Sequence, residues 1–188
     1  MWGNVTNAAI YNNTVYISYT GNTNTAAFYA HDSDSNGKRP QNVQVRNNIF
    51  YTTNGAKILN LNSGVASYGK ISFAGNAYYT NGGSFKIAWG SSTYSSLTDW
   101  RNAKGQEKYN GASVGYQGDP KLANAGHGGT IGNADSLRNL SAYKLASGSP
   151  LVNKGVSAPT FLSSATLDFF GGTLPKGGQY DIGIYEMA

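Results

Sequence analysis

Alternating apolar and polar positions recur three times in the first half of the chain, each time around an asparagine. The three segments are 8–16, 43–51 and 71–79, aligned on Asn13, Asn48 and Asn76. They share the template apolar-x-apolar-x-(Asn/Gly)-Asn-x-(Val/aromatic)-Tyr, with offsets of 35 and 28 residues between the asparagines. A repeat of this period is typical of stacked supersecondary units.

The template also predicts what one unit contains. Apolar residues at alternating positions indicate a half-buried strand. The asparagine ends that strand, because Asn tolerates left-handed backbone angles and favours turns. A short β-branched and aromatic stretch follows it, and further strands are predicted at 26–30, 57–61 and 85–89. Each unit therefore consists of strands and loops, with no room for a packing helix.

Parallel stacking of such units predicts a β-solenoid of about three coils. Equivalent asparagines would then lie about 4.8 Å apart, close enough for a ladder of side-chain amide hydrogen bonds. The composition agrees, since only 12% of the 188 residues are charged while Gly and Tyr number 25 and 14. There is no cysteine, and no apolar run approaches the roughly 20 residues that span a bilayer.

The pattern changes after residue 94. Residues 95–105 predict one short helix, with Ser96 as N-cap, Leu97 and Trp100 on one face, and Gly105 as the stop. Gly- and Asn-rich stretches follow. We therefore expect one domain in two parts: coils at 1–94, and a helix and cap layer at 95–188.

The repeat begins close to Met1, and no capping segment or signal region precedes it. Because solenoids normally need a cap, we expect the first coil to meet either upstream coils of a longer chain or a second copy.

Motifs in the second part resemble a known family. In order, they are Ser-Leu-x-x-Trp100, Gly105-Gln, Asp119-Pro, Leu145-x-x-Gly-Ser-Pro-Leu-Val-Asn-x-Gly155, Asp168-Phe-x-Gly and Asp181-Ile-Gly-x-Tyr-Glu186. This order resembles the C-terminal part of secreted bacterial right-handed parallel β-helix proteins of the pectate-lyase-like group. The resemblance implies an all-β right-handed parallel β-helix with an irregular cap containing one short helix, an extracellular location and a polysaccharide partner. It does not fix the activity, since members include lyases and hydrolases.

Charge is distributed unevenly along the coils. No acidic residue lies between Asp34 and Asp99, and six basic residues do: Lys38, Arg39, Arg46, Lys57, Lys70 and Lys86. Such a field attracts an anionic polymer. Uronate polysaccharide fits better than nucleic acid, for which no motif is present. The alternative is a solvated basic surface without a partner.

The segment from His31 to Gly37 matches the first half of a calcium loop, with Asp32, Asp34 and Asn36 as oxygen ligands. An EF-hand is excluded, because Val43 stands where the bidentate Glu is needed. The resemblance implies that calcium neutralises a uronate carboxylate while a Lys or Arg removes the neighbouring proton. Lys38 and Arg39 are then the catalytic candidates, and an ordinary exposed turn is the alternative.

Aromatic residues offer candidates for sugar stacking, although most are expected in the core. Trp89 is the best exposed candidate, because it ends a predicted strand beside Gly90. Trp100 is expected in the core. The two histidines, at positions 31 and 127, have no Ser or Cys partner in a recognisable motif.

The acidic residues of the tail are interpreted as turn and cap residues, with a catalytic pair as the alternative. They are Asp168, Asp181 and Glu186.

Three functional hypotheses follow. The first is a non-catalytic carbohydrate-recognition or scaffold module of a secreted polysaccharide-acting protein, binding acidic sugar through Arg46, Lys57, Lys70, Lys86 and Trp89. The second is an enzyme, either a calcium-dependent uronan lyase using residues 31–39 or a fragment of a glycoside hydrolase. The third is a structural or adhesin solenoid.

Overall fold

The computed structural model describes residues 1, 5–18, 21–22, 24–32, 38–158 and 166–187. The strands of the first part are β1 (Thr6–Tyr11), β2 (Thr14–Ser18), β3 (Ala26–Ala30), β4 (Gln41–Arg46), β5 (Ile49–Thr53), β6 (Lys57–Leu61), β7 (Ile71–Ala74), β8 (Ala77–Asn81), β9 (Ile87–Trp89) and β10 (Ser92–Tyr94). Two α-helices are α1 (Ser63–Tyr68) and α2 (Leu97–Lys104). The second part adds β11 (Lys108–Tyr109), β12 (Ala112–Ser113), β13 (Tyr116–Gln117) and the 3₁₀ helices η1 (Ala134–Asn139) and η2 (Ser141–Tyr143).

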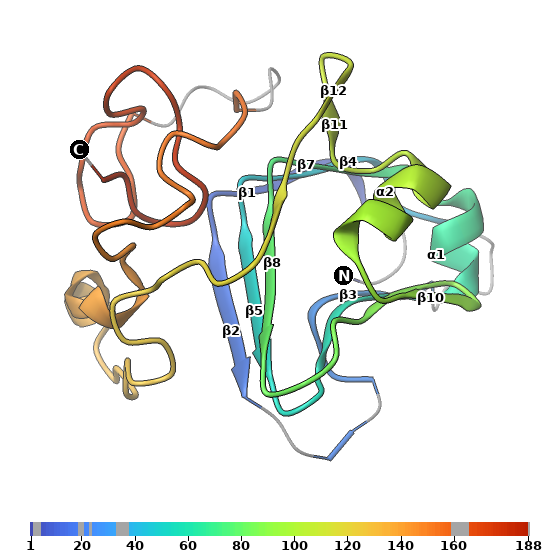
Figure 1. The fold of residues 1–188 in the computed structure, drawn as a ribbon, viewed down its shortest axis with the longest axis horizontal. Helices are drawn as coiled ribbons and strands as arrows, with labels where there is room; N and C mark the ends of the chain where they lie inside the picture. The colour runs from blue at the N-terminus through green and yellow to red at the C-terminus, as the bar shows by residue number, and fades with distance from the viewer. Residues whose placement is uncertain (2–4, 19–20, 23, 33–37, 159–165, 188) are drawn as a thin grey trace.

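Equivalent strands of the three repeats pair side by side in parallel (Figure 1). The first sheet has the order β1-β4-β7, the second β13-β8-β5-β2 and the third β10-β9-β6-β3. The register follows the sequence template, since Val15 lies opposite Phe50 and Phe50 opposite Tyr78. The prediction that the repeats stack is therefore confirmed.

The predicted asparagine ladder is present at the corner between the first and second sheets. Asn13 Nδ2 donates to Asn48 Oδ1 over 2.9 Å, and Asn48 Nδ2 donates to Asn76 Oδ1 over 2.9 Å. The backbone N–H groups donate to the same oxygens: Asn13 N to Asn48 Oδ1 over 3.1 Å, and Asn48 N to Asn76 Oδ1 over 2.9 Å. Because Asn48 and Asn76 are fully buried, these bonds satisfy polar groups that water cannot reach.

The left-handed backbone angle belongs to the residue before each ladder asparagine. Asn12, Asn47 and Gly75 have φ of 53°, 54° and 72°. The two residues of the (Asn/Gly)-Asn pair therefore have different roles: the first turns the chain, and the second supplies the side-chain amide of the ladder.

The main core lies between the three sheets and is filled by columns of equivalent residues. One column consists of Phe28, Leu59 and Ile87, and another of Val45 and Phe73. All five side chains are at most 7% exposed. Stacked apolar side chains from successive repeats therefore supply the burial that a single repeat lacks.

Helix α2 forms as predicted. The Ser96 side chain accepts a hydrogen bond from Asp99 N, and Gly105 ends the helix with φ of 66°. Trp100 is fully buried against Phe73 and Trp89, with ring centroids 5.4 and 5.5 Å apart. The expectation that Trp100 belongs to the core is confirmed.

Helix α1 was not expected, because the repeat unit was predicted to hold no helix. Asn62 starts it by accepting a hydrogen bond from Val65 N over 3.1 Å, and Val65 is buried. An N-capping Asn in front of Ser-Gly-Val-Ala was the available sequence signal.

The segment after α2 adds small elements and a second core. β11 and β12 form an antiparallel hairpin, while β13 joins the second sheet beside β8. On the outer face of that sheet, Leu145, Leu151 and Ile182 pack with Ile49 and Ala77. Residues beyond 94 thus cover part of the repeats, and they also contribute a strand to them.

This architecture corrects the predicted fold class, an all-β right-handed parallel β-helix with one short helix in its cap. The described residues form separate sheets, parallel ones among them, accompanied by two α-helices and two 3₁₀ helices, so the chain is mainly β and not all-β. The antiparallel pairing of β9 with β10 also departs from parallel winding. The template specified strands and corners, but the helices form in the connecting segments, where local capping decides.

Within the described residues, no helix combines the length and apolar character required to cross a membrane.

Candidate functional site

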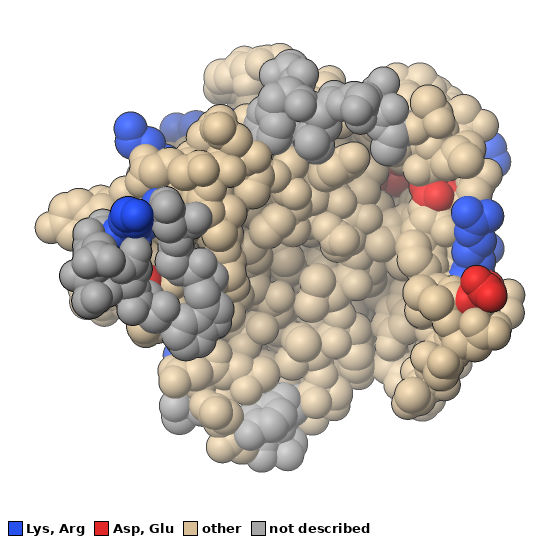
Figure 2. Space-filling view, turned by 180° about the vertical axis from the view of Figure 1, so that it is seen from behind, with Lys and Arg blue, Asp and Glu red and all other residues tan. Residues whose placement is uncertain are grey.

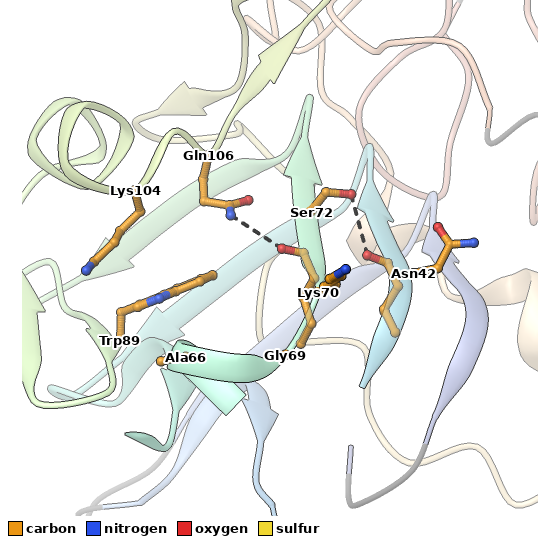
Figure 3. A pocket seen from close by; sticks show the side chains of 10 residues that line it. Asn42, Ala66, Gly69, Lys70, Ser72, Trp89, Lys104 and Gln106 are labelled. Atoms are coloured by element: carbon orange, nitrogen blue, oxygen red, sulfur yellow. Dashed lines mark hydrogen bonds between the residues drawn. The ribbon is translucent and has the colours of Figure 1, made fainter. Parts of the chain in front are cut away.

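A groove of about 470 Å³ lies beside β7 and has one lysine on each side (Figure 3). Lys104 comes from the last turn of α2 and Lys70 from the segment between α1 and β7. Figure 3 shows Lys104, Gln106 and Trp89 along one side of the groove, with Lys70, Ser72 and Asn42 along the other. The remaining lining residues are Val43, Ala66, Gly69 and Ile71.

The groove has a one-sided charge. Both lysines are exposed, and none of the ten lining residues is Asp or Glu. Two ammonium groups without a nearby lining carboxylate favour an anionic ligand. The volume falls in the range of small-molecule sites.

The wall of the groove is fixed by Gln106, which completes the free edge of β7. Its Nε2 donates to Ile71 O over 3.3 Å, and its Oε1 accepts from Phe73 N over 2.9 Å. One side-chain amide thus replaces a neighbouring strand. Because both the nitrogen and the oxygen of the amide are hydrogen-bonded to β7, Gln106 holds the groove wall in place and does not offer these groups to a ligand.

Trp89 lines the groove but is only 8% exposed, contrary to the expectation of an exposed stacking platform. Its ring packs against Phe73 and Trp100, with centroids 6.1 and 5.5 Å away. The position at the end of β9 was predicted correctly, but the strand end points inward.

The other predicted sugar-binding residues do not join this groove. Lys57 and Lys86 line a second groove of about 340 Å³ near Asn54 and Gly55. Arg46 turns to the second part of the chain, where its Nη1 donates to Ser157 O over 3.0 Å. The six basic residues therefore lie in several places and do not form one positive wall.

The predicted catalytic and calcium loop is described only in part, since Asp34 and Asn36 lie outside the described residues. Asp32 pairs with Arg39, with Nε 2.7 Å from Oδ2, and its other carboxylate oxygen accepts from Asn62 Nδ2. Arg39 thus occupies the carboxylate that calcium would need. Lys38 is exposed. The calcium site therefore stays a prediction, and the described residues contain no group of three or more His, Asp or Glu able to hold a metal.

The carboxylates of the tail are held by backbone amides, as expected for turn and cap residues. Asp181 accepts from Asn153 N over 2.6 Å and from Met187 N over 2.7 Å. Glu186 accepts from Asp181 N over 2.9 Å, and Asp168 accepts from Glu186 N over 2.9 Å. Burial raises the pKa of Glu186. These hydrogen bonds give the three carboxylates a structural role in the turns of the tail.

Glu107 is a buried carboxylate that the sequence prediction missed, and it closes the asparagine ladder. Asn76 Nδ2 donates to its Oε1 over 2.7 Å, Gly75 N donates to its Oε2 over 2.6 Å, and the Tyr78 hydroxyl donates to its Oε1 over 2.5 Å. The carboxylate stands where the amide oxygen of the next ladder asparagine would be. Glu107 follows Asn76 by 31 residues, within the spacing range of the repeat, and this was the available signal.

Burial raises the pKa of Glu107 to about 6, while hydrogen bonds from Tyr78, Asn76 and Gly75 hold it down. Burial and the neighbouring carboxylate raise the pKa of Tyr78 well above its ordinary value. A perturbed buried acid is often functional. Glu107, however, is fully buried, so a ligand in the groove does not reach it.

Comparison with protein-family models gives no match for this chain, and comparison with curated proteins gives none. The resemblance to the pectate-lyase-like group therefore stays a prediction from the tail motifs.

Proposed function

We propose that this protein is a carbohydrate-recognition or scaffold module that binds acidic, uronate-containing polysaccharide in the groove beside β7. The observation that carries the proposal is that Lys70 and Lys104, from separate elements, both line a groove that no carboxylate lines. A uronan presents one carboxylate per sugar ring, so neighbouring rings match two separated ammonium groups.

The rest of the groove suits a sugar in the same way. Ser72 and Asn42 provide exposed polar groups along β7 and β4, and the buried Trp89 supplies an apolar surface below them. Such a mixture of a few polar groups around apolar surface is typical of sites for small ligands. The tail motifs add the expectation of a secreted bacterial protein acting on polysaccharide.

The test is calorimetric or affinity-electrophoresis binding to polygalacturonate, alginate and a neutral glucan. We expect binding to the uronans and not to the glucan, weakening as salt is raised. Lys70→Ala combined with Lys104→Ala should weaken binding by about tenfold or more, since charge-assisted hydrogen bonds contribute about 1.5–3 kcal/mol each.

The matched control replaces Lys57 and Lys86 in the second groove, which changes the net charge equally. Its binding should remain within about twofold of the unmodified protein. Equal losses for both double variants would show a diffuse charge effect, and no binding to either uronan would remove the proposal. Absorbance of unsaturated sugar in the same mixtures, with and without chelator, tests the lyase hypothesis separately.

A further inference from the structure

The first repeat stands at one end of the three larger sheets. β1, β2 and β3 each occupy the last position of their sheet, so each pairs with another strand on one side only among the described residues. Met1 meets part of the β3 edge, since its amino group donates to Tyr29 O and its carbonyl accepts from His31 N. Open edges of this kind are templates for pairing with another chain.

Apart from the Met1 ammonium group on the β3 edge, this end lacks the charged side chains that ordinarily keep edge strands apart. No Lys, Arg, Asp or Glu occurs from Met1 to His31. Figure 2 views the molecule from behind, opposite to the side on which α2 and the β11–β12 hairpin face the viewer in Figure 1. The centre of that face shows no blue or red atoms, and the charged side chains gather at its margins. Natural edges are usually protected by charge or proline, so this one fits a surface meant to be covered.

The apolar side chains of the first repeat are also less buried than their partners in register. Residues of the second repeat are at most 1% exposed where the first-repeat residues opposite them are only partly buried: Val43 against Ala8, Val45 against Ile10, and Phe50 against Val15. The core thus continues to this end, where Met1 and Val5 pack against it and Ala8, Ile10 and Val15 remain only partly buried.

The hydrogen bonds of the asparagine ladder all run in one direction, from the first repeat toward the third. Every step sends its backbone N–H and its Nδ2 toward the next repeat, so Asn13 uses both of its donors on Asn48. Asn13 Oδ1 accepts no hydrogen bond from the described residues. At the other end the same two donors of Asn76 are received by Glu107. Glu107 therefore closes the ladder after the third repeat, whereas the first repeat presents the acceptor Asn13 Oδ1.

We propose that the first repeat is a docking surface for one further repeat of the same template on a partner polypeptide segment, whose ladder asparagine donates to Asn13 Oδ1. A second copy docked head to head would set one Asn13 acceptor against another, and head-to-tail stacking is blocked by Glu107. This inference stands apart from the sugar groove, because it uses none of the groove residues.

The first experiment adds one further repeat in front of the first one. A copy of residues 41–68 replaces residues 1–5 directly before Thr6, a spacing set by the pairing of Thr6 with Gln41 and of Val43 with Ile71. The thermal midpoint should rise by about 5 °C or more, because each stacked repeat adds an interface. The control carries Asn48→Ala within the added copy and should retain less than about half of the rise. An unchanged midpoint overturns the proposal.

The second experiment keeps the native chain and decides the matter if the extended chain precipitates. A biotinylated peptide of residues 41–68 is immobilised, and binding of the protein is measured by interferometry. The peptide should bind, and its Asn48→Ala form should bind at least about tenfold more weakly. Equal binding of the two peptides, or sedimentation of the native chain as a dimer, overturns the proposed partner.

Discussion

Glu107 makes the stability of this protein depend on pH in a direction opposite to that of an ordinary paired carboxylate. Its pKa is about 6 in the folded protein, against an ordinary value of 4.5. Between these values the native state holds the proton more tightly than the unfolded chain does. The contribution of Glu107 to stability is therefore fully present below about pH 4.5 and is lost as the pH rises through about 6.

The magnitude follows from the same two values. A pKa raised from 4.5 to about 6 corresponds to on the order of 2 kcal/mol of unfolding free energy. For a chain of this size, that is a fall of about 4–8 °C in the thermal midpoint. The decline should be complete near pH 7.

The assay compares the unmodified protein with Glu107→Gln by chemical unfolding at a series of pH values from 4 to 8. The substitution leaves one of the donors from Gly75, Asn76 or Tyr78 without an acceptor, a cost that is independent of pH. Subtracting the two curves therefore isolates the titration of Glu107. The unmodified protein should lose about 2 kcal/mol relative to the variant between pH 4 and pH 7.

Tyr78→Phe supplies a control with a predicted direction. Removing the phenol takes away a hydrogen bond that lowers the pKa of Glu107, so the decline should move to higher pH. Parallel pH curves for the unmodified protein and Glu107→Gln would refute the reasoning, as would a difference that grows in favour of the unmodified protein as the pH rises.

Two further stability predictions concern the ladder and the core, both measured by denaturant unfolding. Asn48→Ala should lower the free energy of unfolding by about 3–5 kcal/mol, because Asn48 bonds to several buried groups. Asn13→Ala at the exposed end should lower it by only about 1 kcal/mol. Similar losses for the two variants would show that the ladder does not stabilise the stacking of the repeats. Trp100→Ala should cost about 3–5 kcal/mol through the cavity it leaves, while Tyr68→Ala, at a side chain 72% exposed, should stay within about 0.5 kcal/mol. A small loss for Trp100→Ala would mean that the surrounding aromatic rings close the cavity.

The features that the sequence predicted correctly are local or periodic. The alignment of Asn13, Asn48 and Asn76 set the register of three sheets, because a ladder of identical side chains requires identical positions in successive repeats. Helix α2 was predictable for a different reason: its cap at Ser96 and its stop at Gly105 lie within one short segment. Each of these depends on neighbours in sequence or on a fixed spacing.

What the tertiary structure alone decided is which side chains meet across different elements. Lys104 lines the same groove as Lys70 because α2 packs beside β7 through Trp100 and Phe73, and no spacing in the sequence indicates this. Trp89 is largely buried in the core and Arg39 pairs with Asp32, so neither residue is free in the way the sequence suggested. The sequence by itself determined the repeat, its ladder and the uncharged first strands. The folded chain determined where the charges gather and how Glu107 ends the ladder, because those contacts join layers that are distant along the chain.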